Sequence, residues 1–155
     1  GEYIMSSNQV GYYYVLISPN KNFSTVNSST KVTIRNVNGT STNGGYGILI
    51  HCEVNSPLKS DYGFLIDSDK QSYRITQHTN QKESAVVDWV RFPAIRSGTQ
   101  SNELEVVDND DKISFYINGQ FATEIEDKIN PNEGVFGLFV SDGVPIAFSN
   151  LESAK

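Results

Sequence analysis

The feature of this chain that most constrains its fold is an alternation of apolar and polar side chains with a period of two. One example is the segment 45–53, whose apolar face carries Tyr46, Ile48, Ile50 and Cys52. Most of the other apolar segments alternate in the same way. An α-helix repeats every 3.6 residues, so this pattern instead predicts strands with one buried and one solvated face, which are typical of antiparallel sheets.

Short turn signals separate the alternating segments. Asn-Gly and Asp-Gly pairs supply the positive φ angles of tight turns, and many short strands with frequent turns predict an all-β antiparallel sandwich or barrel. Residues 86–90 also fit a helical turn, which Pro93 would end. The polar residues 20–29 are expected to form a surface loop. The predicted strands cover residues 11–18, 31–35, 46–53, 62–67, 72–77, 85–90, 103–107, 112–117, 120–125, 135–140 and 146–151.

Length and composition limit the functions open to the chain. Its 155 residues fit a single domain, 1–155, with a core between two layers. The net charge of −6, with 12 basic residues scattered among 18 acidic ones, argues against a nucleic-acid partner. No run approaches the roughly 18–20 apolar residues of a spanning helix, so membrane insertion is not expected. Residues 1–8 show no signal peptide, while the abundance of Asn, Ser, Thr and Tyr favours a secreted or cell-surface location.

Cysteine and histidine are too sparse to form an obvious metal or redox motif. The single Cys52 has no disulfide partner and is expected to act as a small hydrophobic side chain within a strand. The two histidines, His51 and His78, lack the spacing of zinc ligands. No cofactor is therefore expected, with calcium as the one alternative.

Two acidic turns offer oxygen ligands for that calcium. Asp67 and Asp69 lie in one turn, and Asp108 and Asp110 lie in another, each with carboxylates at alternate positions. Asp also favours tight turns for purely local reasons, and neither segment has EF-hand spacing. A calcium site and a plain turn both stay open as interpretations.

Several segments from about residue 45 onward resemble a known family. The most specific are FYINGQ at 115–120, GVFGLFV at 134–140 and AFSNLE at 147–152. In their order, these segments resemble bacterial concanavalin A-like jelly-roll domains related to the laminin G-like group and to the 3-keto-disaccharide hydrolases. The resemblance implies two packed antiparallel sheets, one of them concave, and a glycan-related function. Likeness of fold does not by itself specify function.

A sugar-cleaving enzyme would need two carboxylates that face each other across a cleft. The Glu-x-Asp-x-x-Glu motif of jelly-roll glucanases does not occur in the chain. The pairs Glu103/Glu105 and Glu124/Glu126 share strand faces without aromatic neighbours in sequence, which favours a solvated surface. No catalytic residue is assigned.

The aromatic residues divide between core and surface. At least one of the consecutive residues 12–14, all tyrosines, must face away from the core. Trp89 is expected to be a packing anchor. The tyrosines that share the apolar parity of their strands, and are expected in the core, are Tyr46, Tyr62 and Tyr73.

A ligand-binding face is predicted from polar and aromatic residues on the solvated parity of their strands. If these strands are neighbours on the concave sheet, they bring together the hydrogen-bonding groups and the ring that sugar sites require. The leading hypothesis is a non-catalytic carbohydrate-binding or accessory module whose partner is a glycan or polysaccharide. A sugar-acting hydrolase and an adhesion or sensor module that binds protein are the alternatives. The predicted ligand-binding residues are His51, Glu53, Arg74, Thr76, His78 and Tyr116.

Overall fold

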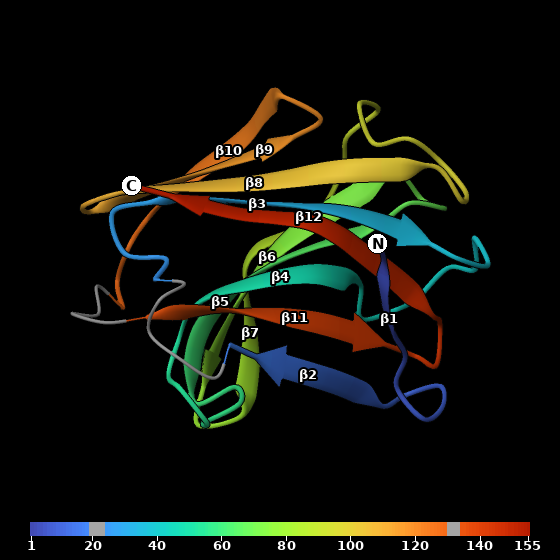
Figure 1. Ribbon diagram of the computed structural model, residues 1–155, viewed down its shortest axis with the longest axis horizontal. Coiled ribbons are helices and arrows are strands. Elements are labelled where there is room, and N and C mark those ends of the chain that lie inside the picture. The colour runs from blue at the N-terminus through green and yellow to red at the C-terminus, as the bar shows by residue number, and fades with distance from the viewer. Residues whose placement is uncertain (19–23, 130–133) are drawn as a thin grey trace.

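The computed structural model describes residues 1–18, 24–129 and 134–155, which form two six-stranded antiparallel sheets packed face to face (Figure 1). Sheet A consists, in spatial order, of β1 (Tyr3–Met5), β12 (Ile146–Ala154), β3 (Ser29–Asn36), β8 (Ser101–Asn109), β9 (Lys112–Ile117) and β10 (Gln120–Glu126). Sheet B consists of β2 (Tyr13–Ile17), β11 (Val135–Ser141), β4 (Tyr46–Cys52), β5 (Ser60–Asp67), β6 (Ser72–Thr79) and β7 (Lys82–Arg91). The predicted sandwich is confirmed.

Each of the eleven predicted segments corresponds to a strand of the structure, although the predictions 11–18 and 46–53 extend past the ends of β2 and β4. The ambiguous residues 86–90 belong to the strand β7, and the short β1, which pairs with β12, was not predicted. Residues 20–23 of the predicted loop lie outside the described residues. The expectation of a surface loop is wrong for Thr25 and Ser28, which are both buried.

The predicted turn residues take the backbone conformations that their types allow. Asn118 and Gly119 join β9 to β10 with φ angles of 52° and 80°, the pair of positive values typical of a type I′ hairpin. Asp142 and Gly143 join β11 to β12 with φ angles of 60° and 70°. The first turn joins two paired strands of sheet A, whereas the second carries the chain from sheet B to sheet A.

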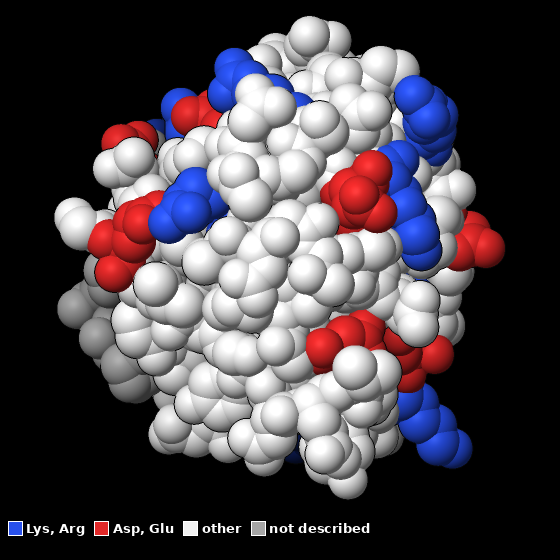
Figure 2. Space-filling model, turned by 90° about the vertical axis from the view of Figure 1, so that its right-hand side faces the viewer, with Lys and Arg blue, Asp and Glu red and all other residues white. Residues whose placement is uncertain are grey.

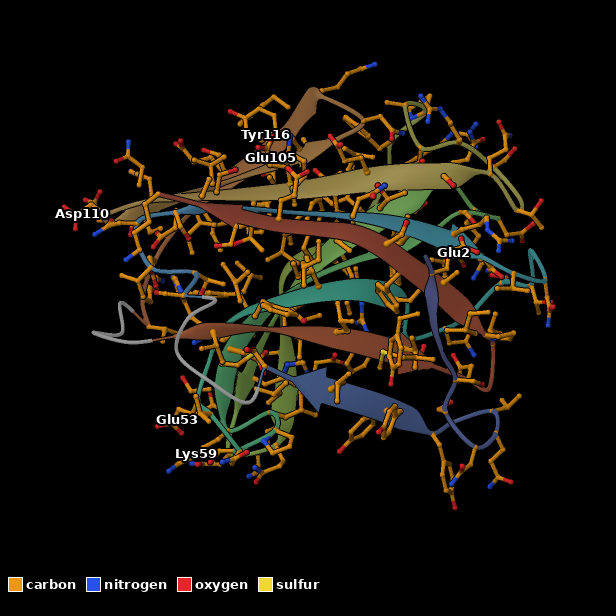
Figure 3. All side chains as sticks on the ribbon, in the orientation of Figure 1. Glu2, Glu53, Lys59, Glu105, Asp110 and Tyr116 are labelled. Atoms are coloured by element: carbon orange, nitrogen blue, oxygen red, sulfur yellow. The ribbon has the colours of Figure 1, made fainter. Side chains whose placement is uncertain are left out.

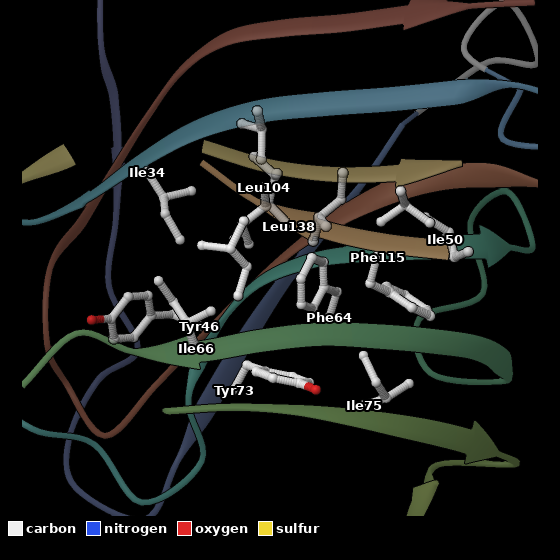
Figure 4. Packing of buried hydrophobic residues seen from close by; sticks show 14 of the residues in the cluster. Ile34, Tyr46, Ile50, Phe64, Ile66, Tyr73, Ile75, Leu104, Phe115 and Leu138 are labelled. Carbon is white, nitrogen blue, oxygen red and sulfur yellow. The ribbon is translucent and has the colours of Figure 1, made fainter. Parts of the chain in front are cut away.

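The main core lies between the two sheets and consists of the inward-facing side chains of both (Figure 4). Phe64 of β5 packs edge-on against Phe115 of β9, with ring centroids 5.0 Å apart. The three tyrosines predicted in the core, Tyr46, Tyr62 and Tyr73, are all buried there. The alternation of the strands therefore predicted the inward face correctly for most of the chain.

A second, smaller apolar cluster lies on the face of sheet B that points away from sheet A. Leu49, Leu65 and Phe139 belong to this cluster, although a strand face outside a two-layer sandwich would normally contact water. Leu58 and Val54 of the β4–β5 connection and Val15 and Ile17 of the edge strand β2 also belong to it. We infer from this burial that sheet B is concave on its outer face, so that its margins cover its centre.

A bulge in β4 changes which side chains reach that outer face. His51 has a φ angle of 60°, and the register of β4 with β11 shifts between Leu49 and Cys52. Beyond the bulge the parity of the strand is reversed. The prediction that Cys52 shares a face with Tyr46, Ile48 and Ile50 is therefore wrong, because Cys52 joins Leu49 in the outer cluster.

Charged side chains are dispersed over the part of the surface shown in Figure 2. Small groups of basic and acidic residues alternate there with broad uncharged areas. No helix in the described ranges combines the length and the apolar character needed to cross a membrane.

Candidate ligand-binding site on the outer face of sheet B

Three of the six predicted ligand-binding residues come together on β6. Arg74, Thr76 and His78 alternate along this strand and point to the concave outer face of sheet B. Thr76 and His78 are only 0% and 2% exposed, and the Arg74 side chain is 13% exposed. The expectation of a solvated strand face is therefore wrong for these residues, because the curvature of the sheet buries them.

The other three predicted residues lie elsewhere. His51 is buried where the ends of the two sheets meet, because the β4 bulge directs its ring away from the concave face. Glu53 is exposed beside Lys59 on the β4–β5 connection, whereas Tyr116 lies on sheet A across from Glu105 (Figure 3). The prediction that all six residues share one face is wrong, since period-two parity does not tell which sheet a strand joins.

Buried charges organise the centre of the β6 face. His78 Nδ1 lies 2.7 Å from Asp61 Oδ1 on β5, and His78 Nε2 lies 3.3 Å from Glu83 Oε1 on β7. Arg74 Nη2 lies 3.3 Å from Glu83 Oε2 and donates a hydrogen bond of 2.8 Å to the Gly44 carbonyl. Two cations and two carboxylates thus alternate across β5, β6 and β7.

The pKa values of these groups reflect burial opposed by pairing. Burial lowers the pKa of His78, but the hydrogen bonds and charges of Asp61 and Glu83 outweigh it and raise that pKa to about 9. The hydrogen bond from His78 lowers the pKa of Glu83, helped by Arg74. Burial outweighs pairing at Asp61 and raises its pKa above the usual carboxyl value. His78 is therefore an imidazolium cation at neutral pH.

Aromatic rings line the adjoining part of the face. Tyr13 of β2 stacks on Phe139 of β11 at 5.9 Å and 13°, and Phe139 in turn lies 6.2 Å from the His78 ring at 29°. Tyr13 is 55% exposed, so one face of this stack remains open to solvent. Trp89 of β7 is half-buried and carries the Arg74 guanidinium over its ring at 5.2 Å, a cation–π contact that helps to hold Arg74 in place.

A shallow, open pocket of about 380 Å³ lies between β2, the turn at residues 43–44 and the β6–β7 pair. Its walls include Tyr12, Tyr13, Phe139, Arg74 and Glu83. Such a pocket combines exposed ring surface with a cation and a carboxylate, which together can bind a molecule that has apolar faces and several hydroxyl groups.

Hydrogen-bonding capacity is left over on this face. Within the described residues, Arg74 Nε, Thr76 Oγ1 and Asp61 Oδ2 are buried polar atoms without a hydrogen-bond partner. Buried polar atoms of native proteins are nearly always paired, so three such atoms on neighbouring strands indicate that something else completes their bonding. Arg74 lines the pocket directly, and the other two lie deeper on the same face.

The predicted calcium turns differ from each other in the structure. Asp67 accepts a hydrogen bond from the Ser41 hydroxyl and another from the amide of Asp69, as a plain turn requires. Asp108 instead lies with His51 and Asp127 in the one group of three candidate metal ligands found among the described residues. Asp110 is exposed at the tip of the β8–β9 turn and does not join that group (Figure 3).

Four residues of the site were not predicted from the sequence. Tyr13 was recognised only as one of three tyrosines of which one must face outward, and Phe139 was assigned to an apolar strand. Asp61 and Glu83 lie just before the predicted starts of their strands, at residues 62 and 85. Both strands were predicted to start too late in the sequence. Starting each of them two residues earlier places Asp61 on the same strand face as Gly63 and Glu83 on the same strand face as Ala85.

Comparison with solved structures assigns the fold to the concanavalin A-like jelly-roll class. The carbohydrate-binding module CBM66 from Bacillus subtilis is similar, with a TM-score of 0.76 and 15% identity over 100% of this chain and 92% of that one. Chicken galectin 2 has a TM-score of 0.60 and 7% identity, covering 90% of this chain and 97% of that one. The catalytic domain of an endo-1,3-β-glucanase from Thermotoga petrophila has a TM-score of 0.60 and 9% identity, covering 86% and 65%.

These identities are low enough that the likeness establishes the fold alone. No protein-family model matches the chain, and no curated protein matches its sequence. The jelly-roll part of the sequence resemblance is confirmed. Its narrower part, to the laminin G-like and 3-keto-disaccharide hydrolase groups, stays a prediction.

Proposed function

We propose that this protein is a non-catalytic carbohydrate-binding module whose glycan binds in the pocket on the concave face of sheet B. The observation that supports this most directly is the exposed ring of Tyr13 in the same pocket as Arg74, whose Nε lacks a hydrogen-bond partner in the described part of the chain. A sugar can bind to both side chains, because its C–H faces stack on aromatic rings and its hydroxyls accept and donate hydrogen bonds.

The charge network favours binding over hydrolysis. A glycosidase needs one carboxyl group with a raised pKa as general acid and a second carboxylate near the scissile bond. Glu83 and Asp142 are the carboxylates that line the pocket. His78 and Arg74 lower the pKa of Glu83, and at Asp142 burial is outweighed by hydrogen bonds from backbone amides, which lower its pKa. Asp61, whose pKa is raised, is fully buried beneath and bonded to His78. Both carboxylates of the pocket are thus held ionised, so neither is a general acid, and both can accept hydrogen bonds from sugar hydroxyls.

Similarity of fold to sugar-related proteins supports the same conclusion. The carbohydrate-binding module CBM66 and two galectins match at least 90% of this chain. The glucanase catalytic domain is longer, since this chain spans only 65% of it. The likeness to the binding proteins supports the proposal of a binding module, and we further propose that the protein acts outside the cytoplasm.

The proposal is tested by glycan titration of paired variants. Tyr13 and Phe121 are both 55% exposed, but Tyr13 lines the pocket whereas Phe121 packs beside Tyr116 on sheet A. A screen over a glycan panel identifies a ligand by its rise in melting temperature, and calorimetry then gives its Kd. We expect Tyr13→Ala to weaken binding about three- to tenfold, since a stacked ring is worth about 0.5–1.5 kcal/mol. Phe121→Ala should leave binding unchanged.

A second pair of variants tests the polar half of the pocket. Arg74→Lys keeps the positive charge and removes the guanidinium fork, so binding should fall by about tenfold or more. Arg35→Lys is the matched control, because Arg35 forms its ion pair with Glu2 on the other sheet. Loss of binding in Phe121→Ala or Tyr116→Ala instead would move the site to sheet A. Sustained turnover of a glycoside, abolished by Glu83→Gln, would replace the proposal with the hydrolase hypothesis, and binding to protein but to no glycan would favour the adhesion hypothesis.

A further inference from the structure

A second group of functional side chains lies away from the glycan pocket, where the ends of the two sheets meet. His51 comes from β4, Asp108 from the end of β8, and Asp127 from the residue after β10. His51 Nε2 lies 2.9 Å from Asp127 Oδ2 and 3.5 Å from Asp108 Oδ2. The three side chains are 0%, 3% and 1% exposed for His51, Asp108 and Asp127, so the cluster is closed to bulk water.

The cluster contains more negative charge than its own hydrogen bonds offset. Two carboxylates face a single imidazole, and Asp108 Oδ1 is a buried oxygen with no hydrogen-bond partner among the described residues. A buried carboxylate in this position needs either a proton or a cation beside it.

The separations of His51 Nε2 from the two carboxylate oxygens suit a small tetrahedral ion, and all three ligand atoms lie within 4.8 Å of one another. Bonds of about 2.0–2.1 Å to zinc place neighbouring ligand atoms about 3.3 Å apart, between the two distances that the cluster shows. Calcium would instead need six or more oxygen ligands and has little affinity for an imidazole. The chemistry of one imidazole and two carboxylates thus selects a transition metal over calcium.

The surrounding residues orient the three side chains as metal ligands are usually oriented. Thr25 Oγ1 lies 2.9 Å from His51 Nδ1 and accepts a hydrogen bond from the His51 amide. With Nδ1 protonated and donating to Thr25, Nε2 is free to bind a metal. Asp108 Oδ2 accepts a hydrogen bond from the Asn27 amide, and Asp127 Oδ1 accepts one from the Ile129 amide. Such second-shell bonds fix the ligand orientation.

We propose that His51, Asp108 and Asp127, with a buried water molecule as the fourth ligand, form a site for a divalent transition metal, with zinc preferred, which links sheet A to sheet B at this end of the sandwich. The bulge at His51 has a direct role here, because the positive φ angle is what turns the imidazole toward the two carboxylates of sheet A. The site does not depend on the proposed glycan function, since it shares no residue with the pocket.

Titration with Co²⁺ and Zn²⁺ alone tests the proposal. The metal-free protein should bind one equivalent of Co²⁺ with the intense visible absorption of a tetrahedral site, and Zn²⁺ should displace it. Asp108→Asn should weaken this binding at least about tenfold. Asp110→Asn is the matched control, because it removes an exposed carboxylate two residues away and should leave the affinity unchanged.

A second measurement avoids any dependence on the folding of Asp108→Asn. The chain has two histidines, so their ring resonances can be assigned with a single His78→Gln variant. Zinc should shift the His51 resonances and leave those of His78 in place. Absence of saturable one-to-one binding, equal binding by Asp108→Asn and wild type, or a zinc shift at His78 instead of His51 would each overturn the proposal.

Discussion

Stability should depend on pH through His78, and this dependence is the most exacting test of the charge network. The pKa of His78 in the folded protein is about 9, above the ordinary value of 6.5 that the unfolded chain has. Between these two pH values the folded protein holds a proton that the unfolded chain has released. The stability contributed by the network is therefore complete below pH 6.5 and is lost as the pH rises through about 9.

The size of the effect follows from the same two pKa values. One proton difference corresponds to about 1.4 kcal/mol of unfolding free energy per pH unit, and thus to about 2 kcal/mol between about pH 7 and about pH 8.5. Glu83 is 36% exposed, so solvent screens part of its attraction for His78. We therefore expect a loss of about 1–2 kcal/mol over this range. Other buried groups do not contribute to this slope, because their pKa values are raised from ordinary values that already lie above this pH range. These groups are Cys52, with an ordinary value of 9.0, and Tyr46, Tyr62 and Tyr73, with an ordinary value of 10.0.

Urea unfolding, followed by far-UV circular dichroism at closely spaced pH values, measures this slope. Asp61→Asn removes the closest negative charge from His78 and should flatten the slope, because the His78 pKa then falls back toward neutrality. Asp69→Asn, which removes an exposed carboxylate, should keep the wild-type slope. Two results would refute this account of the charge network. One is a His78 ring that titrates near its ordinary value in the folded protein, and the other is an equal loss of unfolding free energy with rising pH in Asp61→Asn and wild type.

Three further perturbations test the core and the connections. Phe115→Ala should lower the unfolding free energy by about 3–5 kcal/mol in urea titrations, because the ring is fully buried between the sheets; a loss below about 1 kcal/mol would contradict the packing. Cys52 should resist thiol reagents until the protein unfolds, since burial raises its pKa well above the ordinary value; rapid stoichiometric labelling of the native protein would count against this. Asp142→Ala should cost about 1–2 kcal/mol in thermal unfolding, since its carboxylate accepts hydrogen bonds from three backbone amides; an unchanged melting temperature would show these bonds to be unimportant.

The strands were predictable because their alternation and turn chemistry are local properties. The turns Asn118-Gly119 and Asp142-Gly143 show the positive φ angles that their residue types allow. The first connects two paired strands, and the second connects strands of different sheets. The predicted core tyrosines are buried for the same local reason. β1 was missed because three residues are too few for a period to appear.

The candidate site was only partly predictable because it depends on curvature and sheet membership. Arg74, Thr76 and His78 alternate on one strand, so their shared face could be inferred. Their burial could not, since it arises from the way in which the distant β2 and the β4–β5 connection cover the centre of sheet B. Tyr116 has the same outward parity but lies on sheet A, and alternation carries no information on that difference.

The metal cluster shows a different limit of sequence reasoning. His51 was assigned to the polar face by counting in twos along β4, but a single residue with a positive φ angle reverses this count. Asp108 was recognised as a candidate metal ligand, but it was paired with Asp110 instead of with His51 and Asp127. Asp127, 76 residues from His51 in sequence, comes close to it only because β10 ends where the β4 bulge lies. No spacing rule for metal ligands covers three such separate segments.

The two proposed sites together account for an otherwise costly feature of the fold. A buried polar atom without a partner costs about 1–3 kcal/mol, so four of them would remove a large part of the 5–15 kcal/mol that stabilises a typical domain. Among the described residues, Arg74 Nε, Thr76 Oγ1 and Asp61 Oδ2 lie on the concave face, and Asp108 Oδ1 belongs to the carboxylate whose Oδ2 lies 3.5 Å from His51. Arg74 lines the glycan pocket, with Thr76 and Asp61 buried beneath it, and a metal ion at His51 would place a cation beside the Asp108 carboxylate. Local violations of packing rules are expected where a protein binds something else, and that distribution favours two binding sites over chance defects in the core.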